Sequence, residues 1–269
     1  MMLLYRLYQI CFMLPVLLVA TLLTAIMVII GSLLGGGNWW GYYPPMLWSR
    51  LFCLLSFVRV TVRGRENIDK KISYVFVANH QGAYDIFSIY GYLGHNFRWM
   101  MKASLRNIPV VGYACHCAKQ IYVDKSSPSA LRSTMERAEK VLSGGMSLVV
   151  FPEGARSWNG RMRAFKRGAY MLATEFNLPV VPLTVDGSFD VMPRFKKLPV
   201  PGHIILTIHK PVYPPKDGYN LPDLMQQTFD TIGSALPEGY RPDGVNDGTR
   251  NGVISGVISS AATDNKRIN

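Results

Sequence analysis

The stretch that decides the fold reads Ser73-Tyr74-Val75-Phe76-Val77-Ala78-Asn79-His80-Gln81-Gly82-Ala83-Tyr84-Asp85. Its first half is rich in β-branched and aromatic residues, which predicts a buried strand that ends at Asn79. Gly82 loosens the turn that follows, and we expect a helix over residues 83–92. His80 would then lie at a strand end, and Asp85 in the first turn of a helix, where the helix dipole favours a carboxylate.

The spacing of His80 and Asp85 lets the carboxylate reach back to the imidazole ring. A ring held by a carboxylate on one nitrogen can take a proton from a hydroxyl with the other, which is the base and orienting half of a catalytic triad. No serine or cysteine nucleophile stands beside the pair in sequence, so the hydroxyl would belong to a substrate. The alternative for this stretch alone is a turn histidine with one backbone hydrogen bond and an aspartate that only caps a helix.

A second apolar run, Ser147 to Phe151, is followed by Pro152-Glu153-Gly154-Ala155-Arg156-Ser157. Proline and glycine close the strand and leave Glu153, Arg156 and Ser157 in the loop after it. Ligands of α/β sheets bind outside the carboxyl ends of the strands, so we expect this loop and the His80 turn to meet in one crevice. An arginine there can grip a phosphate through two parallel hydrogen bonds.

Four sequence blocks lie between residues 73 and 185, and their combination and order are specific. They are Asn79-His80 with Asp85, Lys102-Ala103-Ser104-Leu105-Arg106-Asn107-Ile108-Pro109-Val110-Val111-Gly112, Phe151-Pro152-Glu153-Gly154-Ala155-Arg156-Ser157 and Val180-Val181-Pro182-Leu183. In this combination the chain resembles the glycerolipid acyltransferase family, specifically its 1-acylglycerol-3-phosphate acyltransferases. The resemblance implies an α/β domain with a mixed sheet flanked by helices, and transfer of an acyl chain to the sn-2 hydroxyl of 1-acylglycerol 3-phosphate, giving phosphatidic acid for phospholipid biosynthesis.

The resemblance also implies roles for single residues. His80 would be the base and Asp85 its orienting carboxylate, while Arg156, with Ser157 and the Glu153-Gly154 turn, would hold the substrate. Lys102 could meet phosphate or a developing oxyanion, or could be a solvated lysine. The implied co-substrate is acyl-CoA or acyl-carrier protein, and the implied acceptor is a lysophospholipid, with no cofactor.

Three positions depart from the family's pattern. Gly82 stands where serine is usual, Ala155 where threonine is common, and Lys125 where an arginine is usual after Asp124. We expect the relation of His80 to Asp85 to survive these changes. Two alternatives stay open: an enzyme of the same family with another acceptor, such as lyso-ornithine lipid or glycerol 3-phosphate, and a non-catalytic lipid-binding protein of the membrane.

The composition fits a basic protein of a membrane surface. The chain has 269 residues, 49% of them hydrophobic, and a formal net charge of +12. The charge is spread among apolar segments and no nucleic-acid motif occurs, so we expect membrane lipids and phosphorylated substrates rather than nucleic acid. Four cysteines predict a reducing compartment, and Cys115-His116-Cys117 has no second ligand pair, so no metal site is expected.

An uncharged segment from Cys11 to Leu34 is long enough to cross a bilayer, although Pro15 and a glycine cluster leave a bent or re-entrant element open. Aromatic residues of the kind found at headgroup level follow it, and a second apolar stretch from Leu47 to Val58 predicts an interfacial helix. Several arginines come after the first segment, namely Arg50, Arg59, Arg63 and Arg65. The positive-inside rule therefore predicts a catalytic domain on the cytoplasmic face, of the inner membrane if the cell is bacterial.

Alternating strand and helix signals begin near Val60. Strands are predicted at Val60 to Val62, Ser73 to Ala78, Gln120 to Val123, Ser147 to Phe151, Val180 to Val185 and Ile204 to His209. One helix is predicted between Ser127 as N-cap and Gly144-Gly145, and another from Lys166 to Phe176. The expected organisation is a membrane-anchoring helical region at 1–58, a catalytic domain at 59–237 and a disordered tail at 238–269.

Overall fold

The computed structural model describes residues 2–124, 126–218 and 220–243. Lys125 and most of the predicted tail, residues 244–269, therefore lie outside the described residues. The first part of that predicted tail is ordered, because Glu238–Tyr240 forms a 3-10 turn and the carbonyl of Tyr240 accepts a hydrogen bond from the amide of Met162 at 3.1 Å. Residues 238–240 thus contact the chain at Met162, and the domain boundary at residue 237 stays a prediction.

The described chain contains a seven-stranded sheet in the order β1-β7-β6-β2-β5-β3-β4. The strands are β1 (Val58–Arg63), β2 (Val75–Ala78), β3 (Phe97–Lys102), β4 (Ile121–Val123), β5 (Ser147–Val150), β6 (Val180–Asp186) and β7 (Gly202–Ile208). Neighbouring strands run parallel except β6 and β7, which are antiparallel. The mixed sheet inferred from the resemblance is confirmed.

Strand β3 was not among the strands predicted from the apolar pattern. Arg98 interrupts its hydrophobic run, yet this side chain is only 1% exposed. Its guanidinium donates hydrogen bonds to the carbonyls of Phe97 and Gly37 and to the side chain of Asn38. A hydrogen-bonded arginine can be buried in a strand, and its partners Gly37 and Asn38 lie far away in sequence.

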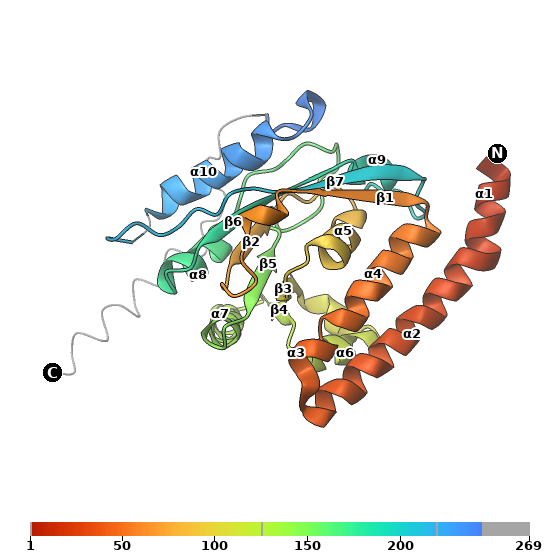
Figure 1. Cartoon of the computed structure of the whole chain (residues 1–269), viewed down its shortest axis with the longest axis horizontal. Helices are drawn as coiled ribbons and strands as arrows, with labels where there is room; N and C mark the ends of the chain where they lie inside the picture. Colours follow the sequence, from red (N-terminus) through yellow and green to blue (C-terminus); the bar gives the residue numbers. More distant parts are fainter. Residues whose placement is uncertain (1, 125, 219, 244–269) are drawn as a thin grey trace.

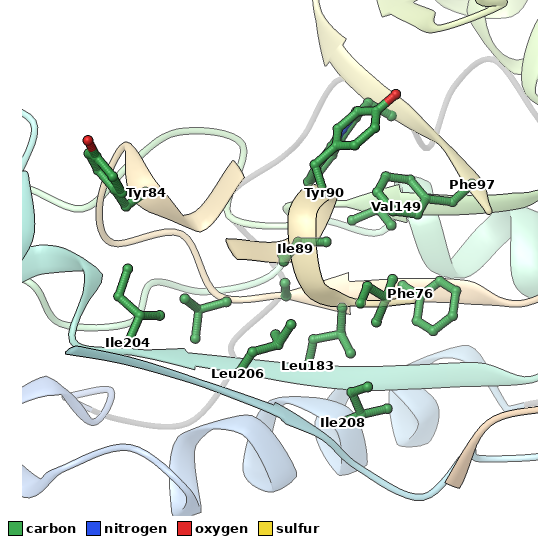
Figure 2. Close-up of a cluster of buried hydrophobic side chains, with 14 of the residues drawn as sticks. Phe76, Tyr84, Ile89, Tyr90, Phe97, Val149, Leu183, Ile204, Leu206 and Ile208 are labelled. Carbon is green, nitrogen blue, oxygen red and sulfur yellow. The ribbon is translucent and has the colours of Figure 1, made fainter. Parts of the chain in front are cut away.

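Helices cover both faces of the sheet (Figure 1). On one face lie α4 (Tyr43–Leu55) and α5 (Tyr84–Tyr92), and on the other lie α7 (Pro128–Ser143), α8 (Gly168–Glu175) and α10 (Leu221–Ser234). Figure 2 shows Phe76, Leu183 and Leu206 on the strands beneath Ile89 of α5, and these four side chains are fully buried. Helix α7 begins as predicted, since Ser127 Oγ accepts a hydrogen bond from the amide of Ala130 at 3.1 Å.

The N-terminal region forms a long, kinked helix that turns back on itself. It comprises α1 (Met2–Tyr8), a π-helical turn (Gln9–Met13), α2 (Leu14–Gly31), a second π-helical turn (Ser32–Gly36) and α3 (Gly37–Trp40). Met2–Trp40 is long and apolar enough to cross a membrane, and only 22% of its most apolar window is buried. The chain bends at Gly35, where φ is +93°, and α4 returns beside α2 with a 2.8 Å hydrogen bond from Trp48 Nε1 to Thr21 Oγ1.

The predicted second apolar stretch is therefore half of a helical hairpin. In α4 the buried residues include Ser49 and Cys53, whereas Leu47 and Leu54 are exposed. The small side chains allow α4 to approach α5 and the sheet closely, and the leucines are left on the outer surface. This arrangement leaves an apolar exterior on both arms of the hairpin, as a membrane-associated element requires.

Short elements complete the described chain. They are the 3-10 turns Arg65–Asn67 and Ala103–Asn107, helix α6 (Val111–Cys117) and helix α9 (Ser188–Val191). Helix α6 packs against α2 through Ala25, Val28, Ala114 and Ala118. Strand β2 lies between β5 and β6 in parallel register, with Val77 opposite both Val150 and Pro182. The loops that follow these three strands consequently emerge at one edge of the sheet.

Candidate active site

His80 and Asp85 meet as the sequence predicts. His80 Nδ1 lies 2.8 Å from Asp85 Oδ2, and the two side chains are 13% and 0% exposed. Within the described residues no hydrogen bond of His80 Nε2 is found, so this nitrogen is the one available to a substrate. The preceding residue anchors the turn, because the Asn79 side chain donates to the carbonyl of Val185 and accepts from its amide, both at 2.8 Å.

Asp85 is held from several directions. Its Oδ2 accepts hydrogen bonds from the amides of Gln81 at 2.8 Å and Gly82 at 3.0 Å, in addition to His80. Its Oδ1 accepts a hydrogen bond from the hydroxyl of Ser188. A carboxylate bonded by this many donors is held in one orientation, so it can fix the imidazole and stabilise a positive charge on it.

Aromatic rings set the plane of the His80 imidazole. The ring of Phe151 stacks on it at a centroid distance of 3.9 Å and an interplanar angle of 10°. The ring of Trp99 stacks in turn on Phe151 at 5.4 Å. The imidazole is thus confined between a carboxylate at its edge and an apolar ring on its face, which leaves it little freedom to rotate.

Glu153 and Ser157 are placed differently from the substrate contact expected of them. Glu153 is 1% exposed, and its two carboxylate oxygens accept hydrogen bonds from the amides of His80 at 2.6 Å and Arg163 at 3.0 Å. Burial raises the pKa of Glu153 to about 8, against these two hydrogen bonds, which lower it. Ser157 is fully buried; its amide donates to the carbonyl of His80 at 2.9 Å and its hydroxyl to Asn159. Both residues therefore hold the loop after β5 against the turn that carries His80 (residues 79–83, the catalytic turn).

Arg156 lies between these two anchors and is half-buried. Across the described part of the chain no hydrogen bond or ion pair of its guanidinium is found, so its charge is available to an anion. Gly154, with φ at +77°, makes the turn before it, and a Cβ built there would lie 2.9 Å from Lys166 Nζ. The ammonium of Lys166 therefore rests on this turn, close to Arg156 in sequence and on the same loop.

Arg194 adds a further cation beside the loop. Its guanidinium donates a hydrogen bond to the carbonyl of Arg156 at 3.3 Å and lies 4.3 Å from the ring centroid of Trp158. Sequence reasoning did not single out Arg194, because it is far from Arg156 in the chain. The loop after β5 is thus surrounded by positive charge, which suits a phosphorylated ligand.

Lys102 is exposed at the end of β3, at the same edge of the sheet. Met101 packs in the cluster that contains Trp99, whereas Met100 packs in the cluster on the other face. Because side chains alternate along a strand, Lys102 starts from the face opposite the Trp99 ring. The structure brings it to the edge but not against His80.

Two features of the site were not predicted from the sequence. The Phe151 and Trp99 rings read as ordinary core residues until the sheet places them beside His80. Ser188 follows the strand β6 and a glycine, which is the same strand-end pattern that drew attention to His80. Applied to Val180-Val185 and the Gly187-Ser188 pair after it, that pattern could have found it.

The fold and the site define an α/β protein in which a histidine bonded to a buried carboxylate lies next to a cationic loop. Residues 59–186 match the family model described as Acyltransferase. The chain is 32% identical over 185 residues to a 1-acyl-sn-glycerol-3-phosphate acyltransferase of Chlamydomonas reinhardtii, a match covering 67% of this chain and 54% of that protein. It is 31% identical over 185 residues to the alpha form of Homo sapiens, covering 68% and 64%.

A solved structure agrees with these relatives. The crystal structure of the 1-acyl-sn-glycerophosphate (LPA) acyltransferase PlsC from Thermotoga maritima matches with a TM-score of 0.60 and 26% identity, covering 80% of this chain and 92% of that one. Over residues 59–186 the chain belongs to the acyltransferase family. It spans about half the length of the first curated relatives that it matches.

Proposed function

We propose that the protein transfers an acyl chain from an acyl thioester, acyl-CoA or acyl-carrier protein, to the sn-2 hydroxyl of 1-acylglycerol 3-phosphate, giving phosphatidic acid. The observation that carries this proposal is the His80–Asp85 pair, bonded at 2.8 Å through Nδ1 with Nε2 free. The names of the relatives and of the solved neighbour, all lysophosphatidic acid acyltransferases, supply the substrate class.

In the proposed mechanism His80 Nε2 removes the proton of the acceptor hydroxyl as the oxygen attacks the thioester carbonyl. Asp85 holds the ring through Nδ1 and stabilises the imidazolium that forms. When the tetrahedral intermediate collapses, the carbon–sulfur bond breaks, and the leaving thiolate takes the proton back from Nε2. The base activates the acceptor directly, so no acyl-enzyme is needed.

The acceptor phosphate would bind the cationic loop. Arg156 has a free guanidinium, and Lys166 rests on the adjoining Gly154 turn. Lys102 is a third candidate, since a flexible lysine at the sheet edge can reach toward the same anion. Fixing the phosphate positions the sn-2 oxygen near His80, and positioning of this kind can contribute several kcal/mol to lowering a barrier.

The hairpin of α1 to α4 would attach this site to the membrane that holds its lipid substrate. Its outer surface carries exposed leucines such as Leu18, Leu23 and Leu47. The arginines that follow the first arm, including Arg59 and Arg63, favour a cytoplasmic position for the catalytic domain.

The proposal is tested with purified protein in lipid and a panel of acceptors, namely lysophosphatidic acid, glycerol 3-phosphate and lyso-ornithine lipid, each with acyl-CoA and with acyl-carrier protein as donor. We expect product with lysophosphatidic acid at a catalytic efficiency well above the other acceptors. A preference for another acceptor would replace the substrate assignment. No transfer to any acceptor from either donor would favour the non-catalytic lipid-binding alternative.

A further inference from the structure

Helix α9 brings a serine onto the catalytic turn from outside the segment that matches the family. Strand β6 ends at Asp186, and Gly187 then adopts φ of +89°, a conformation in which a Cβ would overlap the carbonyl oxygen of His203. This sharp turn directs the chain back across the end of β2. Ser188, the first residue of α9, is fully buried there.

The Ser188 hydroxyl donates a hydrogen bond to Asp85 Oδ1. The other oxygen, Oδ2, is taken by His80 and the amides of Gln81 and Gly82. The catalytic turn thus supplies every partner of Oδ2, and α9 supplies the partner of Oδ1. Because its two oxygens are bonded from different sides, the Asp85 carboxylate cannot rotate about χ2 without losing at least one of these hydrogen bonds.

Gly82 makes this approach possible. A Cβ at position 82 would overlap the carbonyl oxygen of Ser188 and would lie 2.9 Å from its Oγ. Gly82 also forms an antiparallel bridge with Pro193, and the amide of Ala83 donates to the carbonyl of Met192 at 3.0 Å. The missing side chain at 82, noted above as a departure from the family's serine, is what allows the backbone of α9 to lie against the turn.

We propose that Ser188 is a positioning residue of the reaction, which acts through Asp85 on His80, and that Gly82 is the partner that lets it approach. The Asp85 carboxylate receives its one side-chain hydroxyl donor in the described structure from α9. This role rests on the proposed function only in using His80 as the base, and it does not depend on which acceptor is acylated.

The first test compares Ser188→Ala with Ser88→Ala. Ser88 is also fully buried, and its hydroxyl donates to the main-chain carbonyl of Asp85 at 3.0 Å rather than to the carboxylate. We expect kcat of Ser188→Ala to fall about tenfold with KM for both substrates changed less than twofold, because a hydrogen bond to a charged orienting group is lost. Ser88→Ala should keep kcat. Equal kcat in the two variants would overturn the proposal.

The second test is a double-mutant cycle with Gly82→Ala, which displaces α9 from the turn. Adding Ser188→Ala to Gly82→Ala should lower kcat little further, because both changes break the same hydrogen bond. Losses that simply multiply would contradict the assigned pairing. If Gly82→Ala does not fold, the comparison of the two serine variants still decides.

A readout that needs no turnover separates this inference from the proposed function. In protein with isotope-labelled histidine, the ring proton on His80 Nδ1 can be assigned by its loss in His80→Ala. We expect its signal to exchange slowly in the wild type and in Ser88→Ala, and to broaden or vanish in Ser188→Ala. An unchanged signal in Ser188→Ala would refute the positioning role, whereas a wild type inactive on lysophosphatidic acid with the expected signals would refute only the acceptor assignment.

Discussion

At the scale of single residues, the site is defined by which polar atoms are engaged and which are free. Glu153 and Ser157 are buried and bonded to the backbone of the catalytic turn and its neighbouring loop. His80 Nε2 and the Arg156 guanidinium, by contrast, have no hydrogen-bond partner in the described structure and are available to ligands. The motif therefore mixes residues with free polar groups and buried residues that hold the loop in place, and the free groups are the ones proposed to contact substrate.

Arg156 tests this division. Replacing it with alanine should raise KM for the phosphorylated acceptor at least tenfold, because a charge-assisted contact to phosphate is worth about 1.5–3 kcal/mol, and kcat should change much less. Arg156→Lys should recover part of the loss, since it keeps the charge but not the two parallel hydrogen bonds. The measurement is initial rate against lysophosphatidic acid concentration at saturating donor. Unchanged KM in Arg156→Ala would remove Arg156 from the acceptor site.

At the scale of elements, short polar links join pieces that are distant in the chain. His95, in the loop before β3, is 5% exposed, and its Nε2 lies 2.8 Å from the hydroxyl of Ser147 at the start of β5. Tyr74 and Phe76 contact its ring at centroid distances of 5.5 and 5.3 Å. The link lies at the opposite end of the strands from His80, so it bears on stability rather than on catalysis.

Burial, with a smaller contribution from the nearby charge of Lys70, lowers the pKa of His95 from 6.5 to about 4. Between these values the unfolded chain binds a proton that the native protein does not, so stability rises with pH and is lost on acidification from pH 6.5 toward 4. The contribution is about 3 kcal/mol. In denaturant unfolding at a series of pH values, His95→Gln should show a weaker loss across this window, and His116→Gln, at an exposed position, should not. A full loss in His95→Gln would contradict this account.

Most of the helices and strands were predictable from the sequence, because their signals are local. Helix α7 carries its own signals, a serine cap followed by proline and a glycine stop, and it forms between the predicted limits. Strand β2 and helix α5 follow from one apolar run that breaks at a turn. Strand β3 was missed because the arginine within it is hydrogen-bonded to Gly37 and Asn38, which are distant in sequence.

At the scale of the whole molecule, the sheet order explains why the site could be predicted only in part. The loops after β2 and β5 meet because these strands are parallel neighbours, which fits the expectation of one crevice. The contribution of α9 depends on β6 being the other neighbour of β2, and no spacing in the chain predicts strand order. The strand-end pattern can mark Ser188 in the sequence, but only this strand order places it against Asp85.

The hairpin and the catalytic domain form one continuous structure (Figure 1). Helix α2 packs on α6, which begins at the end of the block that starts at Lys102. Arg98 binds the chain at Gly37 and Asn38 beside the bend of the hairpin. The edge of the sheet that carries the site is thereby fixed relative to the apolar hairpin. This architecture suits an enzyme whose acceptor and product both reside in a membrane.

The measurement that tests the central claim most directly is acyl transfer to lysophosphatidic acid by the wild type and by His80→Ala, purified in lipid and checked for equal thermal unfolding. The account predicts phosphatidic acid from the wild type and a loss of at least a thousandfold in kcat for the variant, since removing the base and its orienting contact abolishes activation of the acceptor. Turnover in a folded His80→Ala within tenfold of the wild type would contradict it.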